Sequence, residues 1–346
     1  MVPERPYRLA VLGATGYTGR LVVEEARRAG LALRLVGRAE PSLRALAREG
    51  DEVRVADARD RSGLVAALDG AFALVSLAGP FLEVGDAPVR AALDAGCHYL
   101  DTSGEQAFAR RLYEDHGPAA ERAGLVLLTM FGFDYVPGDL AARLAADGLE
   151  PVDRLDVCYA VAGQGTSRGT KRSAAAIMRS PLASFVDGAL VPIRFGATTR
   201  RFRFPFGAGT GVEWGGGEPL TVPRHTDVRE VRSYVRAPRV AAVAGRFARF
   251  AAPAVALASR LAPEAPRSRR ARARFTVVAE ARGATGARAV ALAGGDVYAA
   301  AAAIAVAGVE ALAAGEACAA GALAPAEAFD PAVLLARLAG VLERVG

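Results

Sequence analysis

A glycine-rich stretch close to the N-terminus constrains the fold of this chain more than any other feature. It reads L-A-V-L-G-A-T-G-Y-T-G and places glycines at Gly13, Gly16 and Gly19, directly after a short apolar run. An amphipathic segment follows and stops before Gly30. This pattern predicts a strand, a tight glycine turn and a helix that ends at a left-handed glycine.

A turn of this kind favours the binding of a dinucleotide. Gly13 permits the sharp turn, Gly16 lets a pyrophosphate approach the backbone, and Gly19 lets the helix pack closely on the strand. The free N–H groups at the helix N-terminus would face the phosphates. An ordinary strand-to-helix turn is the alternative, but the strand–turn–helix context favours the nucleotide. The predicted cofactor contacts in this turn are Gly13, Thr15, Gly16, Tyr17, Thr18 and Gly19.

Arg38 indicates which dinucleotide binds. It follows the second predicted strand, at the place where an NAD-dependent enzyme carries an acidic residue for the ribose 2′-hydroxyl. A guanidinium can instead hold a 2′-phosphate through two hydrogen bonds. A solvated arginine at a strand end is the alternative. Because the acid is absent as well as the arginine present, the sequence predicts NADP(H).

Composition limits the remaining classes of function. The 346 residues suffice for about two domains, and 52% hydrophobic with 23% charged residues is typical of a soluble globular protein. The formal charge of +6 suits anionic ligands, whereas no basic block interleaved with aromatic residues indicates nucleic acid. The three cysteines are widely spaced, which predicts neither a disulfide framework nor a metal site.

The chain offers no signal for a membrane or for export. The first predicted strand begins near Arg8 and leaves no room for a signal peptide. The longest apolar run, Val297 to Val309, is shorter than the roughly 20 residues that a membrane helix needs. We therefore expect a cytoplasmic protein without an integral membrane segment.

Strand and helix patterns alternate through the first part of the chain, as a doubly wound parallel sheet requires. After Pro137 the connections become longer and richer in glycine and proline, which predicts a second α/β domain with a mixed or antiparallel sheet. The six strands expected in the first part are 8–12, 31–36, 52–56, 72–78, 97–102 and 125–130, and those expected in the second part are 155–162, 200–206, 228–236, 274–281 and 288–293.

Ligands of open parallel sheets lie at the carboxyl ends of the strands. This rule adds Asp57, Ser76, Ala78, Gly79, Pro80 and Ser103 to the expected cofactor site, although Asp57 and Ser103 would also suit helix N-caps. It also places Asp101, Glu105, Phe133, Asp134 and Tyr135 near the reacting end of the cofactor.

At this point the sequence resembles the saccharopine dehydrogenase-like NADP-binding oxidoreductases, including the trans-acting enoyl reductase branch. The motifs that carry the resemblance follow one another along most of the chain: G-A-T-G-Y-T-G at 13–19, G-R at 37–38, A-G-P-F at 78–81, Y-L-D-T-S-G-E at 99–105, G-F-D-Y-V-P-G-D-L at 132–140, S-R-G-T at 167–170 and P-A-E-A-F-D at 325–330. One departure is Tyr135, because the family usually has serine there.

The resemblance implies an N-terminal Rossmann domain over 1–136, a substrate and dimerisation domain over 137–296, and a C-terminal helical segment over 297–346 that returns to the first domain. It also implies NADPH as hydride carrier, enoyl or imine substrates, and a homodimer. Short-chain dehydrogenase chemistry is excluded, because no tyrosine stands four residues before Lys171, the only lysine. Cys97 and Cys158 suit packing better than nucleophilic catalysis.

Reduction of a double bond needs a proton donor or a dipole beside the reacting atom. The candidates are Tyr135, Asp134 and Asp101, with Glu105 and Phe133 beside the substrate. Tyr135 would also suit an amphipathic wall, and Asp134 a helix cap. Arg168, Lys171 and Arg172 are expected to form a cationic rim for an anionic substrate group, or else a solvated helix start.

The sequence thus predicts an NADPH-dependent reductase of an activated C=C or C=N bond in a biosynthetic small-molecule, polyketide or carrier- or CoA-linked acyl substrate. The alternative is an NADP-binding sensor or scaffold protein without turnover, because no unmistakable catalytic acid is present.

Overall fold

The computed structural model describes residues 8–163, 182–238, 240 and 273–346, which fall into two compact units. The first unit comprises Met1–Ser103, Phe108–Gly132 and Ala301–Leu323, and the second comprises Gly104–Ala107, Phe133–Ala300 and Ala324–Gly346. The C-terminal segment is therefore divided between the two units. Each unit is built around one sheet.

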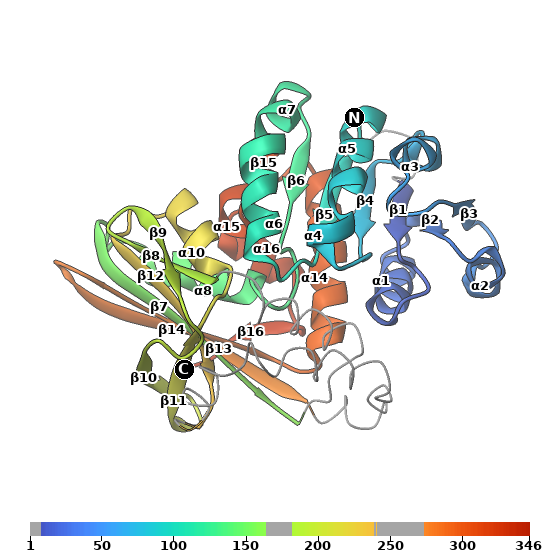
Figure 1. The fold of residues 1–346 in the computed structure, drawn as a ribbon. Helices are drawn as coiled ribbons and strands as arrows, with labels where there is room; N and C mark the ends of the chain where they lie inside the picture. Colours follow the sequence, from blue (N-terminus) through green and yellow to red (C-terminus); the bar gives the residue numbers. More distant parts are fainter. Residues whose placement is uncertain (1–7, 164–181, 239, 241–272) are drawn as a thin grey trace. The chain divides into compact units, whose positions relative to one another are not determined.

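The first unit contains a seven-stranded sheet whose described strand pairs are all parallel (Figure 1). Most of its strands are short apolar runs buried on both faces, which is what a parallel sheet covered by helices needs. The expected doubly wound sheet is confirmed. In sheet order the strands are β15 (Gly321–Ala322), β6 (Val126–Leu128), β5 (His98–Asp101), β4 (Ala73–Ser76), β1 (Arg8–Leu12), β2 (Ala32–Gly37) and β3 (Glu52–Val55).

Strand β15 is the one strand of this sheet that the sequence did not predict. It has two residues, too few for a periodic pattern, and it pairs with β6 at the sheet edge. The helices of this unit are α1 (Tyr17–Arg28), α2 (Glu40–Leu46), α3 (Arg61–Leu68), α4 (Phe81–Val84), α5 (Asp86–Ala95), α6 (Gln106–Arg111, which starts in the second unit), the π-helix η1 (Leu112–His116), α7 (Gly117–Arg122) and most of α14 (Val297–Ala313).

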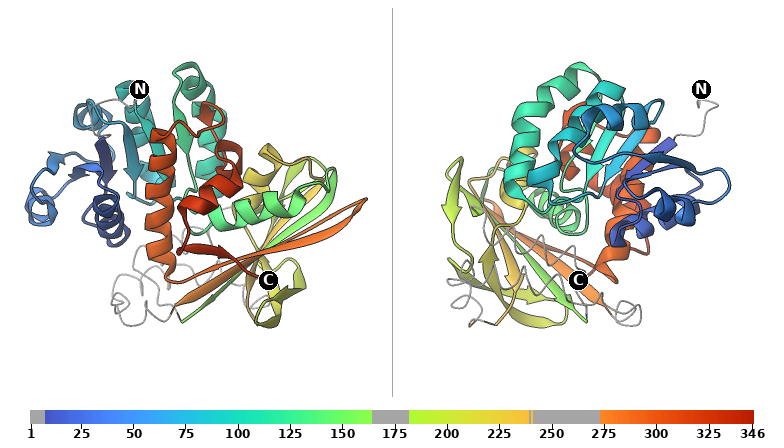
Figure 2. Two further views of the ribbon diagram at one scale, coloured as in Figure 1. Left: turned by 180° about the vertical axis from the view of Figure 1, so that it is seen from behind. Right: turned by 45° about the vertical axis from the view of Figure 1, so that its right-hand side comes forward.

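Two residues, Pro118 and Gly308, shape the helices of this unit. Helices α6 and α7 are separated by η1, because Pro118 in the first turn of α7 has no N–H to continue the hydrogen-bond ladder. Helix α14, orange in Figure 2, packs closely because Gly308 has no side chain: a Cβ there would lie 2.4 Å from the Phe131 ring and 3.0 Å from Leu100 of β5.

The second unit contains a mixed sheet with nine described strands, as the sequence predicted in kind. Strands β7 and β12 pair in parallel and all other described pairs are antiparallel. The main path runs β10 (Thr199–Phe204), β11 (Gly207–Trp214), β12 (Glu230–Arg236), β7 (Val152–Ala162), β13 (Arg274–Gly283), β14 (Gly286–Gly294) and β16 (Leu342–Arg344), and β8 (Leu182–Val186) and β9 (Ala189–Ile193) join at β12.

The two faces of this sheet carry different side chains. Helix α8 (Val136–Ala146) packs on β7, β13 and β14, on the face that carries Tyr159 and Ser233. The alternation of a strand therefore places Asp156 and Tyr234 on the opposite face. We call these the helix face and the ion-pair face. The remaining helices among the described residues of the unit are α10 (Glu218–Thr221), the 3-10 helix η2 (Val222–Arg224), α15 (Pro325–Ala328) and α16 (Pro331–Arg337).

Candidate functional site

The glycine turn after β1 has the geometry that its sequence predicted. Gly13 has a φ of +82°, which favours glycine, and its N–H donates to the Val36 carbonyl at 3.0 Å. Gly19 has no room for a side chain, because a Cβ there would lie 2.2 Å from the Gly13 carbonyl oxygen. The turn therefore depends on glycine at both of its ends.

The N-terminus of α1 fits the phosphates of a dinucleotide. Gly16 is the N-cap, no side chain caps the helix, and the first turn contains no acidic residue. The N–H groups of that turn are thus available to an anion, and the positive end of the helix dipole favours one. Gly16 is exposed, while Thr15, Tyr17 and Thr18 are half-buried around the turn.

Arg38, immediately after β2, is accessible to a ligand. Its side chain is 74% exposed, and its one ion pair with a described residue is a loose one of 3.8 Å to Asp57. Asp57 accepts a hydrogen bond from the Arg59 N–H, whereas Asp60 is the residue that caps α3. Asp57 is therefore not the helix cap. An exposed, loosely held guanidinium can turn towards a 2′-phosphate at little cost.

The carboxyl ends of β4 and β5 bring Ser76 and Asp101 side by side, and both are fully buried. Asp101 Oδ1 accepts hydrogen bonds from the Ser103 N–H (2.8 Å), the Thr129 hydroxyl (3.0 Å) and the Met130 N–H (3.2 Å). Burial nevertheless raises the pKa of Asp101 to about 7. Through these contacts Asp101 links the loop after β5 to the loop after β6.

The loop after β4 remains open to a ligand. Gly79 is exposed, and Ala78 and Pro80 are half-buried. This accessibility suits the predicted backbone contact to the nicotinamide side of the cofactor.

In the second unit, an aromatic cluster surrounds the predicted residues Phe133 and Tyr135. The Tyr135 ring stacks on Trp214 with 6.4 Å between centroids and 11° between planes. Tyr159 meets the edge of both Trp214 (6.5 Å) and Phe133 (6.1 Å), and Phe275 packs on Phe133 at 4.5 Å. The cluster joins the start of α8 to the helix face of the sheet.

The buried carboxyl of Glu218 contacts Tyr159 of this cluster, and the sequence did not predict it. Glu218 accepts hydrogen bonds of 2.5 Å from the Tyr159 hydroxyl and of 2.5 Å from the Ser233 hydroxyl. Burial raises the pKa of Glu218 to about 7. The carboxyl lies against the first turn of α8, since a Cβ on Gly138 would be 2.3 Å from Glu218 Oε1.

Tyr135 and Asp134 stand at the start of α8 and differ in their surroundings. The Tyr135 hydroxyl donates to the Gly104 carbonyl at 3.1 Å, and burial raises the pKa of Tyr135 well above its usual value. Asp134 is exposed, yet desolvation by the protein around it raises its pKa to about 6. Helix α8 has no side-chain cap, so Asp134 is not a capping residue. Glu105 is buried in the same unit.

The structure thus gathers Glu105, Phe133, Asp134 and Tyr135 in one unit and adds residues that the sequence missed. Tyr159, Trp214, Ser233 and Glu218 come from separate strands and a short helix. The one available signal was the glycine run of W-G-G-G-E at 214–218, in which Gly215 and Gly216 have no room for a Cβ. The predicted rim of Arg168, Lys171 and Arg172 lies outside the described residues.

The described residues give less support to a cysteine nucleophile or a metal site. Burial raises the pKa of the Cys97 thiol to about 12 and also raises that of Cys158, which disfavours thiolates. Within the described ranges, no group of His, Cys, Asp or Glu side chains could hold a metal ion. Across those same ranges, no helix has the length and hydropathy needed to cross a membrane.

Comparison with known proteins agrees with this geometry. The family model described as "Saccharopine dehydrogenase NADP binding domain" matches residues 9–128, which confirms NADP(H) as the cofactor. A protein of Arabidopsis thaliana named "Probable mitochondrial saccharopine dehydrogenase-like oxidoreductase" is 33% identical over 155 residues, covering 40% of this chain and 34% of the relative. The trans-acting enoyl reductase of Mycobacterium bovis is 30% identical over 145 residues, covering 40% and 35%. The match thus covers about a third of the length of each relative.

A solved structure extends the similarity of fold to the whole chain. Apo saccharopine dehydrogenase (L-Glu forming) from Saccharomyces cerevisiae superposes with a TM-score of 0.64 over 98% of this chain and 100% of that one, at 14% identity. The expected combination of a Rossmann unit and a second mixed-sheet unit is therefore confirmed.

Proposed function

We propose that the protein is an NADPH-dependent reductase of an activated C=C or C=N bond, since residues 9–128 match the model of the saccharopine dehydrogenase NADP binding domain. The observation that carries the proposal is the exposed Asp134 next to Tyr135 in the chain, with the Tyr135 ring stacked on Trp214. Apolar walls and one accessible proton-carrying group are what a reducible acyl or imine substrate needs.

The residues of the first unit hold the cofactor in this proposal. The α1 N-terminus with Gly13, Gly16 and Gly19 binds the pyrophosphate, and Arg38 binds the 2′-phosphate. Asp101 keeps the loops after β5 and β6 in place and acts as a positioning residue. When bound, the nicotinamide supplies the hydride.

The residues of the second unit supply the proton and exclude water. Asp134, whose pKa desolvation raises to about 6, is the proton donor in this proposal and passes its proton to the atom that does not receive the hydride. Tyr135 is neutral, and its hydroxyl is held in place by the Gly104 carbonyl. In this proposal it orients the substrate group that receives the proton. The surrounding rings make the vicinity of Tyr135 apolar, which suits an enoyl thioester on CoA or a carrier, with an imine as the close variant.

Three further features belong to the same proposal. The name of the M. bovis relative favours the enoyl substrate over the imine. We propose a homodimer, as the resemblance implies, and a cytoplasmic location. The Arabidopsis relative is named for the mitochondrion, so fractionation of cells that produce the tagged protein is the check on location.

The test is NADPH consumption, followed by absorbance, with a panel of enoyl thioesters and cyclic imines. Turnover of one class, lost in Asp134→Asn and retained in the exposed control Glu49→Gln, supports the reductase. Tight NADPH binding with no turnover of either class contradicts it and favours the NADP-binding sensor.

A further inference from the structure

The ion-pair face of the second unit contains a cavity of about 680 Å³ that the proposed reaction does not use. Strands β7, β10, β12, β13 and β14 line it. It faces away from α8 and the aromatic cluster, because the side chains of Asp156 and Tyr234 alternate with those of Val157 and Tyr159. Its volume is that of a site for a small molecule.

Like charges stand directly opposite one another across β7 and β13 on the floor of this cavity. Asp156 pairs in register with Glu280, and Arg154 with Arg282. Such pairs destabilise a sheet unless opposite charges compensate them. The two pairs differ in how far this compensation goes.

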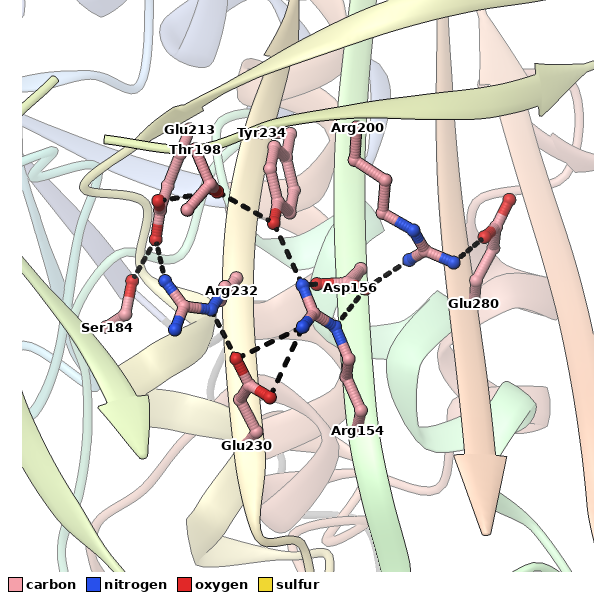
Figure 3. Close-up of polar contacts among 10 residues, drawn as sticks. All are labelled: Arg154, Asp156, Ser184, Thr198, Arg200, Glu213, Glu230, Arg232, Tyr234 and Glu280. Carbon is pink, nitrogen blue, oxygen red and sulfur yellow. Dashed lines mark hydrogen bonds and ion pairs between the residues drawn. The ribbon is translucent and has the colours of Figure 1, made fainter. Parts of the chain in front are cut away.

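The acidic pair is compensated within the protein, as Figure 3 shows. Arg200 reaches from β10 to contact both Asp156 and Glu280, the latter at 2.7 Å. Arg154 adds two hydrogen bonds to Asp156, of 2.7 and 3.1 Å. Asp156 is fully buried, and its charge is neutralised where it stands.

The basic pair is compensated on one side only. Arg154 is bound by Asp156, by Glu230 at 3.3 Å and by the Tyr234 hydroxyl at 3.1 Å (Figure 3). Arg282 is exposed and makes no ion pair or hydrogen bond with any described residue. The cavity therefore contains one guanidinium that lacks a counter-charge, directly opposite a second guanidinium.

We propose that this cavity binds an anionic metabolite through a phosphate or carboxylate group held by Arg282. The hydroxyls of Thr198 and Tyr234 line the same cavity, but Thr198 donates to Glu213 and the two hydroxyls bond to each other, so they can accept hydrogen bonds from the ligand while Arg282 binds its anionic group. An anion bound by Arg282 would form a charge-assisted hydrogen bond with its guanidinium. Its negative charge would also relieve the repulsion between Arg282 and Arg154. This second site is independent of the proposed reduction.

The experiment is calorimetric titration of the full chain with inorganic phosphate and with citrate at constant ionic strength. The Arg282→Ala variant should bind at least about tenfold more weakly, the loss expected for one charge-assisted contact. Its thermal unfolding should occur at the same temperature as that of the unmodified chain or slightly above it, since the side chain has no partner to lose and its repulsion with Arg154 is removed. Arg201→Ala is the matched control, because Arg201 is an exposed arginine outside the cavity lining; it should change the Kd less than about twofold.

A second variant tests the sign of the charge. Glu280→Gln removes a negative charge from the cavity and should strengthen anion binding several-fold. Response to phosphate alone assigns a phosphate-bearing ligand, and response to citrate a polycarboxylate; either supports the proposal. Absence of saturable binding, equal losses in Arg282→Ala and Arg201→Ala, or weaker binding by Glu280→Gln would overturn it. A change of oligomeric state in Arg282→Ala without saturable anion binding would overturn it too, in favour of a contact between two copies.

Discussion

Tyr159 donates a hydrogen bond of 2.5 Å to Glu218, and the two side chains meet beside Gly138 of α8. A Cβ on Gly138 would lie 2.2 Å from the Tyr159 oxygen and 2.3 Å from Glu218 Oε1. The glycine in V-P-G-D is therefore required by side chains from a distant strand and helix. Gly138 has the backbone conformation of an ordinary helix. Close packing, and not a left-handed φ, therefore explains why glycine occupies this position.

The first prediction concerns Gly138→Ala. The added methyl group must displace a buried hydrogen-bonded pair, which should lower the free energy of unfolding by about 1–3 kcal/mol. Urea denaturation measures this. Gly295→Ala is the control, since a Cβ there would have its nearest neighbour at 3.9 Å, and it should change stability by less than about 0.5 kcal/mol. Equal effects of the two substitutions would show that Gly138 is not closely packed.

The second prediction concerns the pH dependence of stability through Glu218. Its pKa is about 7 in the folded protein, against the ordinary 4.5, because burial penalises the charged form. Between these two values the folded chain binds more protons than the unfolded chain, so the stability that Glu218 contributes falls as pH rises. It is fully present below about pH 4.5 and lost above about pH 7.

Glu218→Gln removes this titration while it retains an amide that can accept hydrogen bonds. The unfolding free energy of the unmodified chain minus that of the variant should fall by on the order of 2–3 kcal/mol between pH 4.5 and pH 8. The shifts of Asp101 and Asp134 cancel in this difference. Exposed Glu49→Gln should give a flat difference, and a flat result for Glu218→Gln as well would mean that the buried carboxyl does not titrate in this range.

The third prediction concerns cofactor preference. NADPH should bind at least about tenfold more tightly than NADH, because a guanidinium–phosphate pair contributes about 1.5–3 kcal/mol. Arg38→Ala should remove most of this preference, while exposed Arg28→Ala should retain it. Fluorescence titration with both cofactors measures it. Equal affinities of the unmodified protein for the two cofactors would contradict the assignment of Arg38.

The fourth prediction concerns Tyr135→Phe. Loss of the hydroxyl removes the hydrogen bond to the Gly104 carbonyl and leaves the ring on Trp214 in place. With the substrate that the NADPH assay identifies, kcat should fall about tenfold or more, whereas NADPH affinity should change little. Tyr113→Phe, in η1 of the first unit, is the control. An unchanged kcat would leave Tyr135 with a packing role alone.

Much of the first unit could be predicted because its signals are local. Gly13 requires a positive φ and Gly30 ends α1 in the left-handed region, and both show in the sequence as glycines at fixed spacing. The second sheet was harder to predict. Strand β11 carries Gly207, Gly209 and Gly211, so the residues that usually mark a strand are missing, although close packing against Phe202 and Arg236 explains two of these glycines.

The residues of the candidate site likewise fall into those that the sequence predicted and those that it did not. The sequence by itself determined the nucleotide turn, the position of Arg38 and the class of fold, because these depend on backbone conformation and residue spacing over a few neighbouring residues. Only the tertiary structure decided that Tyr159, Trp214 and Glu218 join Tyr135, and that Arg282 stands opposite Arg154 without a counter-charge. The physical reason is that such contacts depend on strand register and on packing between distant segments, which no local pattern encodes.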